Sequence, residues 1–278
     1  MDCRGIRRQT GRVEHAPRLL LVFGVALTCC GCATLPSGRG WGADATAKPG
    51  WARLGEAAVS AAKDPWVWAP VAGALAFQVN SFDRKTSDWA RENTPIFGST
   101  SGAERWSNNL RTTSGVLMLG TLIATPGGDD TGEWLTNKLR GGTVELGAIG
   151  ATSLATSVLK NTTGRTRPNG ANDESFVSGH TSSAAVSGRL AKINLDAINL
   201  SDGTRLAADI GIDAVVIGTA WARVEAGAHY PSDVLAGMAL GNFFARFVTD
   251  AFLGPDSRQS VALAPLDGGA MLSWDIRF

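Results

Sequence analysis

The sequence predicts an all-α protein, a helical bundle with a short C-terminal β-hairpin. Segments of helical character, rich in alanine, recur between residues 51 and 255 and are separated by glycine and proline. Hydrophobic residues make up 44% and charged residues 18% of the 278 residues, a balance typical of a globular chain with one main core. The last residues instead alternate in the manner of a strand.

Residues 1–32 have the features of an export signal with a lipoprotein-like processing site. Five arginines precede an apolar run from Leu19 to Thr28, which is too short to span a bilayer. Cys32 is the expected lipidation site because a glycine precedes it, and Cys30 is the alternative. Plain secretion with cleavage nearby is the other interpretation. We expect an exported, periplasmic protein that is anchored to the outer membrane.

All four cysteines lie in this leader, so the exported protein should have no internal disulfide framework. Removing residues 1–31, with five arginines and two acidic residues, changes the formal net charge from +1 to −2. A mildly acidic protein is a poor candidate for nonspecific binding of nucleic acid. Residues 33–50 are predicted to form a flexible tether, and the folded domain of residues 51–255 follows.

The helices of this domain are predicted from their capping and breaking residues. Pro65 ends the first helical segment, and an apolar segment with a second proline, Pro70, follows it. A charged amphipathic piece then opens with Ser81 as a possible cap. The helical segments are expected at about 51–64, 81–93, 103–124, 133–160, 179–194, 204–222 and 231–253, and residues 133–160 could form one helix or a helix pair.

Helices rich in alanine and glycine also occur in polytopic membrane proteins, where small residues allow close approach. The mean hydropathy of +0.02 is low for such a protein. The longest uncharged runs, 65–82 and 112–128, contain polar residues, glycine and proline. We therefore expect a soluble or membrane-apposed bundle.

Residues 256–278 predict the β-hairpin, with a turn at Asp267, Gly268 and Gly269. We expect it to cover an edge of the bundle. The apolar residues that alternate in its second run are Leu272, Trp274, Ile276 and Phe278.

Chemistry-bearing residues are concentrated in three segments. In the first, six residues separate Lys160 from Arg167, and Pro168 follows directly; the two cations suit a clamp for an anion. Basic loop residues are more often simply solvated. Arg165, which lies outside the motif, could contribute to the clamp or could equally face the solvent. In the second segment, "SGH" places Ser178 as a helix cap.

In that second segment, Gly179 lets a ligand approach the backbone and His180 stands at the edge of the helix N-terminus. An ordinary capped helix is the alternative. In the third segment, Arg223 is followed by His229 and Asp233, with a proline at the first helical turn. Asp233 can then reach the ring of His229 and fix its tautomer, although a structural histidine with a structural aspartate would give the same spacing.

Together the segments resemble the signature of the type 2 phosphatidic acid phosphatase superfamily: Lys-x6-Arg-Pro, Ser-Gly-His and Arg-x5-His-x3-Asp. The resemblance is specific from residue 160 to about 237 and implies the helical bundle that this superfamily shares with acid phosphatases and vanadium-dependent haloperoxidases. Val177 stands where the family usually has proline, and Ala222 where it often has serine. Neither departure removes a group that does chemistry.

The resemblance implies a metal-independent phosphatase without a cofactor, acting on a phosphate monoester or diphosphate that is either a lipid phosphate or a soluble organic phosphate. His229 would attack phosphorus and form a phosphohistidine, with Asp233 orienting it. His180 would protonate the leaving oxygen and then activate water. The residues implied in holding the phosphoryl oxygens are Lys160, Arg167, Ser178, Gly179 and Arg223.

Two other functions stay open at this point. The same cluster can hold vanadate, which would make the chain a haloperoxidase with His229 bound to the metal. A non-catalytic envelope lipoprotein with a phosphate-binding scaffold is the other. The intact set of His180, His229 and Asp233 favours catalysis over this last alternative.

Overall fold

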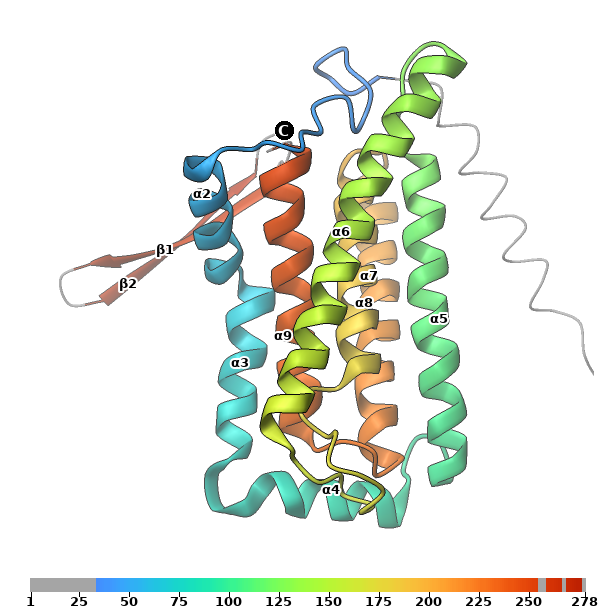
Figure 1. Ribbon diagram of the computed structural model, residues 1–278, viewed down its shortest axis with the longest axis vertical. Helices are drawn as coiled ribbons and strands as arrows, with labels where there is room; N and C mark the ends of the chain where they lie inside the picture. Colours follow the sequence, from blue (N-terminus) through green and yellow to red (C-terminus); the bar gives the residue numbers. More distant parts are fainter. Residues whose placement is uncertain (1–33, 255–258, 267–268, 277–278) are drawn as a thin grey trace, which may run out of the picture.

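The computed structural model describes residues 34–254, 259–266 and 269–276. Between residues 34 and 254 all regular elements are helical, so the predicted all-α class is confirmed there (Figure 1). The α-helices are α2 (Trp51–Lys63), α3 (Pro65–Phe77), α4 (Phe82–Asn93), α5 (Thr100–Ala124), α6 (Thr131–Thr163), α7 (Gly179–Asp196), α8 (Asp202–Glu225) and α9 (Pro231–Val248). A 3₁₀ turn, η1 (Val79–Ser81), precedes α4, and a π-helical turn, η2 (Thr249–Leu253), follows α9.

Capping residues explain where several helices begin and end. Pro65 opens α3, and the side chain of Asp64 accepts from the Trp66 backbone N–H at 2.9 Å. Ser81 was expected to cap α4, but its backbone is left-handed (φ 59°) and its side chain makes no capping bond. Helix α6 is continuous and ends at Thr163, beyond the predicted end at Lys160, and Gly164 follows as the C-cap with φ 53°.

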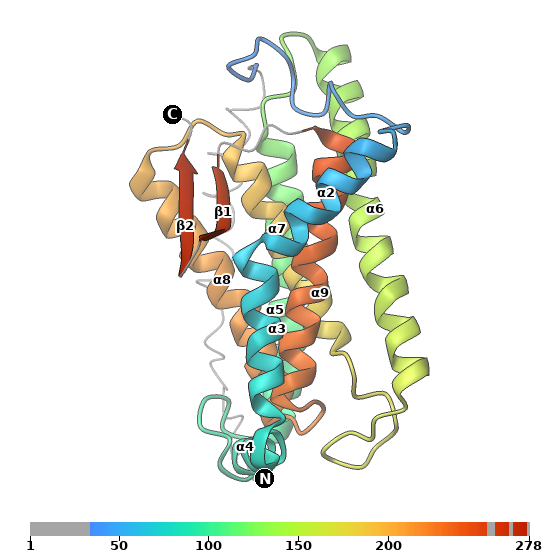
Figure 2. The same cartoon turned by 90° about the vertical axis from the view of Figure 1, so that its left-hand side faces the viewer.

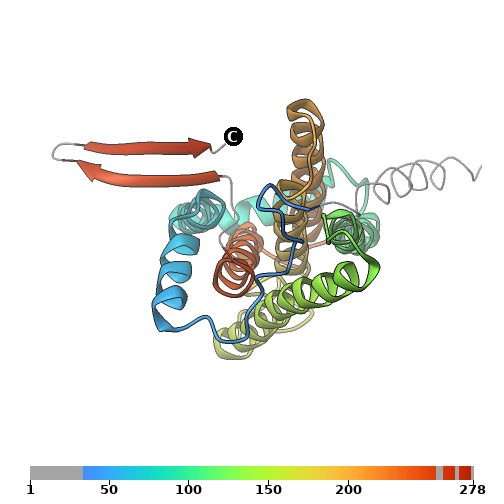
Figure 3. The same ribbon diagram turned by 90° about the horizontal axis from the view of Figure 1, so that it is seen from above.

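Helix α9 lies at the centre of the bundle, between α3 and α7, and also packs on α6 (Figure 3). Glycine lets its backbone approach α7 closely. A Cβ atom at Gly241 would lie 2.5 Å from the carbonyl oxygen of Ser182 and 2.7 Å from the backbone nitrogen of Val186. These are backbone atoms of a neighbouring helix, which cannot turn away as a side chain can. The sequence of α9 therefore needs glycine at this crossing.

Replacing Gly241 with alanine is expected to destabilise the fold by about 2–3 kcal/mol, because the added methyl group forces α7 and α9 apart. The matched control is Gly150→Ala in α6, where a Cβ atom meets nothing within 4 Å. That change should stabilise the protein by about 0.5–1 kcal/mol through helix propensity. Urea denaturation of both variants measures the difference. Equal effects of the same sign would contradict the packing described here.

Two antiparallel strands follow the bundle, β1 (Gln259–Leu266) and β2 (Gly269–Ile276), with Leu263 opposite Leu272 (Figure 2). The turn residues Asp267 and Gly268 lie outside the described residues, so the complete hairpin and its apolar face stay predictions. The export signal and the lipidation candidates Cys32 and Cys30 also lie outside them. Within the described part of the chain, no helix is both long and apolar enough for a membrane span.

Helix α4 crosses one end of the bundle (Figure 1). The connection from α4 to α5 is fastened by Glu225, a fully buried carboxylate at the last turn of α8. It accepts from the backbone N–H groups of Ile96 and Phe97, both at 3.0 Å, and from the Trp221 indole at 2.5 Å. At this same end α6 and α8 finish and α7 and α9 begin, so loops and helix termini from distant parts of the sequence meet there.

Candidate active site

The predicted site residues come together at the end of the bundle that α4 crosses. Lys160 lies in the last turn of α6, Arg223 in the last turn of α8 and Asp233 in the first turn of α9. Ser178 caps α7, and its backbone N–H donates to the Asp233 carbonyl at 3.1 Å. A Cβ atom at Gly179 would lie 3.8 Å from Lys160 Cε. The three sequence segments therefore form one site.

His229 is almost fully buried, with 1% of its surface exposed. Its Nδ1 atom lies 2.7 Å from the Ser175 carbonyl oxygen, which can only accept, so Nδ1 carries the proton and Nε2 keeps its lone pair. The sequence predicted Asp233 as the direct partner of this ring. The structure corrects that geometry, because Asp233 Oδ2 is 3.9 Å from Nδ1 and Ser175 occupies the bonding position.

Asp233 acts on the site through other groups. Its Oδ2 atom accepts from the Ser175 hydroxyl at 2.5 Å and from the Tyr230 backbone N–H at 2.9 Å. It thereby holds the residue whose carbonyl binds His229. Burial raises the pKa of Asp233, while the Ser175 hydrogen bond and Arg165 oppose that shift. Asp233 thus orients His229 indirectly, through Ser175.

The three predicted cations surround the His229 ring. Burial lowers the pKa of His229 well below its usual value, and Arg223, Lys160 and Arg167 lower it further. The Nε atoms of Arg167 and Arg223 are buried and have no hydrogen-bond partner among the described residues. The Lys160 ammonium donates to the Glu174 carbonyl. Unpartnered buried donors beside a neutral imidazole suit an anion that would complete their hydrogen bonds.

No group of three or more His, Cys, Asp or Glu side chains in the described residues could hold a metal ion. The positive charge of the site comes from lysine and arginine. Ser178 is fully buried, and its hydroxyl oxygen accepts from the Thr181 hydroxyl at 3.0 Å. The start of α7 therefore adds backbone N–H groups and the positive end of a helix dipole to the same place.

His180 stands at the first turn of α7, and its Nε2 atom lies 2.7 Å from Asn108 Oδ1 on α5. Burial lowers the pKa of His180 to about 4, with Arg223 and Arg111 as the next causes and Glu104 opposing them. The two histidines therefore share Arg223 as a neighbouring cation. The sequence did not single out Asn108.

Helix α5 also supplies partners for Arg223, which is 3% exposed. Arg223 Nη1 donates to Glu104 Oε2 at 2.7 Å and to the Ser107 hydroxyl at 3.3 Å. Both residues were missed from the sequence, since they lie more than a hundred positions from Arg223 and belong to no local pattern. The available signal in the sequence was that Glu104 and Ser107 are three positions apart, which places both side chains on one face of a helix.

Arg165 was the other residue that the sequence underestimated. Its guanidinium is 29% exposed and bridges two buried carboxylates, with Asp233 Oδ1 at 2.6 Å and Asp83 Oδ2 at 2.7 Å. It also donates to the Ser232 hydroxyl at 2.8 Å and lies over the Tyr230 ring. Arg165 therefore ties the start of α9 to α4 rather than facing solvent.

Replacing Arg165 with alanine should destabilise the fold by about 3 kcal/mol, because Asp83 and Asp233 would face each other without a counter-ion. Differential scanning calorimetry measures the effect. Arg84, an exposed residue of α4, provides the control, and its alanine variant should stay within about 0.5 kcal/mol of the wild type. Equal stability of the two variants would show that the Arg165 bridge contributes nothing.

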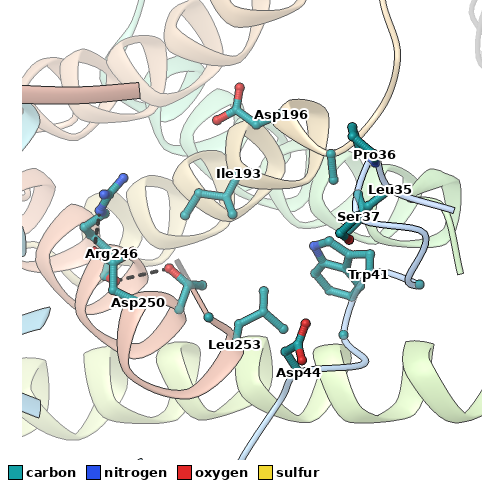
Figure 4. A pocket seen from close by; sticks show the side chains of 15 residues that line it. Leu35, Pro36, Ser37, Trp41, Asp44, Ile193, Asp196, Arg246, Asp250 and Leu253 are labelled. Carbon is teal, nitrogen blue, oxygen red and sulfur yellow. Dashed lines mark hydrogen bonds and ion pairs between the residues drawn. The ribbon is translucent and has the colours of Figure 1, made fainter. Parts of the chain in front are cut away.

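An open groove of about 690 Å³ lies beside the site, between α3 and α9. Apolar side chains such as Leu75, Leu240 and Phe243 line it, while Arg165 and Ser232 line its polar side. A separate pocket of about 190 Å³ lies at the far ends of α7 and α9, next to residues 35–44 (Figure 4). The whole length of α7 separates that second pocket from His180, so of these two cavities the groove is the one that adjoins the candidate site.

Comparison with known proteins agrees with the location of the motifs. Residues 143–254 match the family model described as the PAP2 superfamily. A solved structure from Bacillus subtilis, described as a transmembrane PAP2-type phosphatidylglycerolphosphate phosphatase, is 21% identical, with 66% of this chain and 92% of that chain covered and a TM-score of 0.49. Among curated proteins, none matches this chain.

Proposed function

We propose, from the premise that residues 143–254 belong to the PAP2 superfamily, that this chain is a metal-independent phosphatase that works through a phosphohistidine at His229. The state of His229 carries the proposal. Its Nδ1–H donates to the Ser175 carbonyl, and burial with nearby cations keeps the ring neutral. The Nε2 lone pair is therefore available to attack phosphorus at neutral pH.

The phosphoryl group would be held by the cations around that nucleophile. The buried Nε–H donors of Arg167 and Arg223 have no partner among the described residues, and each can donate to one phosphoryl oxygen. Lys160 adds a third positive charge, and the Gly179 amide with the Ser178 hydroxyl adds neutral donors at the start of α7. Such prearranged donors stabilise the charge of the transition state.

His180 would transfer protons in both half-reactions. It gives a proton to the leaving oxygen when the phosphohistidine forms, and it takes one from the water that breaks this intermediate. Burial and the cations around it lower its pKa to about 4. A phosphate dianion beside Arg223 would offset the positive charge of the cations and raise the pKa of His180. Substrate binding would therefore favour the protonated imidazole that acts as the acid.

The substrate class is a phosphate monoester or diphosphate, and the groove beside the site supports one with a hydrocarbon part. Apolar residues of α3 and α9 line it, and Arg165 and Ser232 connect it to the start of α9. A lipid phosphate would place its head group among the cations and its chain in this groove. A soluble organic phosphate would use the cations alone.

The place of action that we propose is the periplasmic side of the outer membrane. It rests on the leader of residues 1–32 and on lipidation at Cys32, or at Cys30. A lipid anchor would hold the bundle next to membrane lipids. Metabolic labelling with a radioactive fatty acid tests this, since Cys32→Ala should lose the label; retained label that Cys30→Ala removes would move the anchor to that residue.

One assay tests the function. Phosphate release from p-nitrophenyl phosphate and from a short-chain phosphatidic acid is measured in the presence of a chelator, for the wild type and for His229→Ala. The wild type should release phosphate from both, and the variant from neither. Activity that survives the substitution would disprove the mechanism, and activity that chelator removes would disprove metal independence. Bromide oxidation with added vanadate and without phosphate release would favour a haloperoxidase.

A further inference from the structure

Helix α5 presents a polar stripe to the candidate site. Its members, spaced by one helical turn or less, are Glu104, Ser107, Asn108 and Arg111. Glu104 and Ser107 bind Arg223. Asn108 makes a different contact, because its Oδ1 atom lies 2.7 Å from Nε2 of His180, 72 positions away in the sequence. The stripe lies outside the three sequence motifs and outside the family match.

This hydrogen bond decides which nitrogen of His180 can exchange a proton. An amide oxygen accepts and cannot donate, so Nε2 of His180 carries a hydrogen in the contact with Asn108. The neutral ring then has its lone pair on Nδ1. As long as the contact with Asn108 holds, Nδ1 is the atom that gains and loses the second proton.

The charge around His180 makes a neutral partner significant. The charged groups that face it are Glu104 and Arg111 of α5, Arg223 of α8 and Arg167 of the loop before α7. Burial and these cations lower its pKa to about 4. Asn108 adds orientation without adding charge, so the protonation of His180 depends on the anion that binds.

We propose that Asn108 is a positioning residue that holds Nε2–H of His180 and so directs Nδ1 to the leaving group, an inference that rests on the proposed phosphatase function. In the first step the Nδ1 proton moves to the ester oxygen as its bond to phosphorus breaks and phosphorus bonds to Nε2 of His229. In the second step Nδ1 takes a proton from water, the water oxygen bonds to phosphorus, and the phosphorus–nitrogen bond breaks.

Two variants of Asn108 separate orientation from charge. Asn108→Ala removes the acceptor and should lower kcat about 10- to 100-fold for an alkyl phosphate, whose leaving group needs a proton. The loss should be several-fold smaller for p-nitrophenyl phosphate, whose leaving group needs little help. Asn108→Asp keeps an acceptor and adds a negative charge, so the alkaline limb of the kcat profile should move upward by about one pH unit.

Asn109 is the matched control, because it is the neighbouring exposed asparagine of α5 and no hydrogen bond of its side chain is present in the described structure. Asn109→Ala should leave kcat, the leaving-group dependence and the pH profile unchanged. Thermal unfolding of all three variants reports whether they fold. Equal losses of Asn108→Ala on both substrates, or an unchanged pH profile in Asn108→Asp, would overturn the inference.

A readout without turnover distinguishes this inference from the proposed function. The chain contains only three histidines, so ¹⁵N-histidine labelling gives an interpretable spectrum of the ring nitrogens. His180 of the wild type should show the Nε2–H tautomer, and Asn108→Ala should lose that preference. If the wild type releases no phosphate, the proposed function fails whatever the spectrum shows. A wild-type His180 with the proton on Nδ1 overturns the role of Asn108 even in an active enzyme.

Discussion

His229→Gln is expected to lower phosphate release by at least about 10⁴-fold, because it removes the nitrogen that attacks phosphorus in the mechanism we propose. The glutamine amide can still donate to the Ser175 carbonyl, which in the wild type binds Nδ1 at 2.7 Å. The buried carbonyl would thus keep a partner, and the fold should survive. Initial rates with p-nitrophenyl phosphate measure the change.

The folded state of this variant has to be shown separately. Circular dichroism and the unfolding midpoint should stay close to those of the wild type, whereas His229→Ala should be less stable by about 1–3 kcal/mol because it leaves the Ser175 carbonyl unpaired. A folded His229→Gln protein that retains more than a hundredth of the wild-type rate would show that another residue attacks phosphorus.

The second large effect is expected for Arg223→Ala, with a loss in kcat/KM of about 10³-fold. Arg223 is 3% exposed, its Nη1 binds Glu104, and its Nε is a buried donor without a partner in the described residues. Removing it takes away one of the phosphoryl ligands that we propose, and it also removes a cation that lowers the pKa of His229. The pH profile of kcat/KM should therefore shift its acidic limb to higher pH, since the pKa of His229 rises.

Arg223→Lys separates charge from geometry. Lysine keeps the positive charge but lacks the planar fork that spans Glu104 and the phosphate, so an intermediate loss of about 10- to 100-fold is expected. Arg105→Ala, at an exposed position of α5, is the control and should behave like the wild type. Steady-state kinetics of the three variants test this order, and a lysine variant as poor as the alanine variant would show that the fork alone matters.

Local signals in the sequence predicted most of the helices. Glycine and proline mark the ends of α2 and α6 and the start of α9, so their ranges came close to the observed ones. The prediction for α4 was right in range but wrong in its cap, because Ser81 adopts a left-handed backbone in which its side chain makes no capping bond. Sequence pattern also could not predict that α9 would be the central helix.

The candidate site also contains residues that the sequence predicted and residues that it did not. The recognition of the superfamily from three motifs is confirmed by the match of residues 143–254. Asn108 and Asp83 could not be found by that route, since each reaches the site from a helix far away in the sequence. The role expected for Asp233 was also too simple, because the loop with Ser175 inserts between its carboxylate and the His229 ring. Contacts of this kind, in which one residue acts on another through a third, form only when distant segments pack together in the folded bundle.

Mass spectrometry of a trapped phosphoenzyme tests the mechanism at the level of single atoms. His180→Ala should form the intermediate from p-nitrophenyl phosphate, whose leaving group needs little acid, and should be slow to hydrolyse it. Trypsin cleavage after Arg223 and Arg246 gives peptide 224–246, in which His229 is the only histidine. The phosphate should be found on that peptide after quenching at alkaline pH, and should be absent from His229→Gln. Phosphate on any other peptide would contradict nucleophilic attack by His229. So would turnover of p-nitrophenyl phosphate without any phosphorylated enzyme.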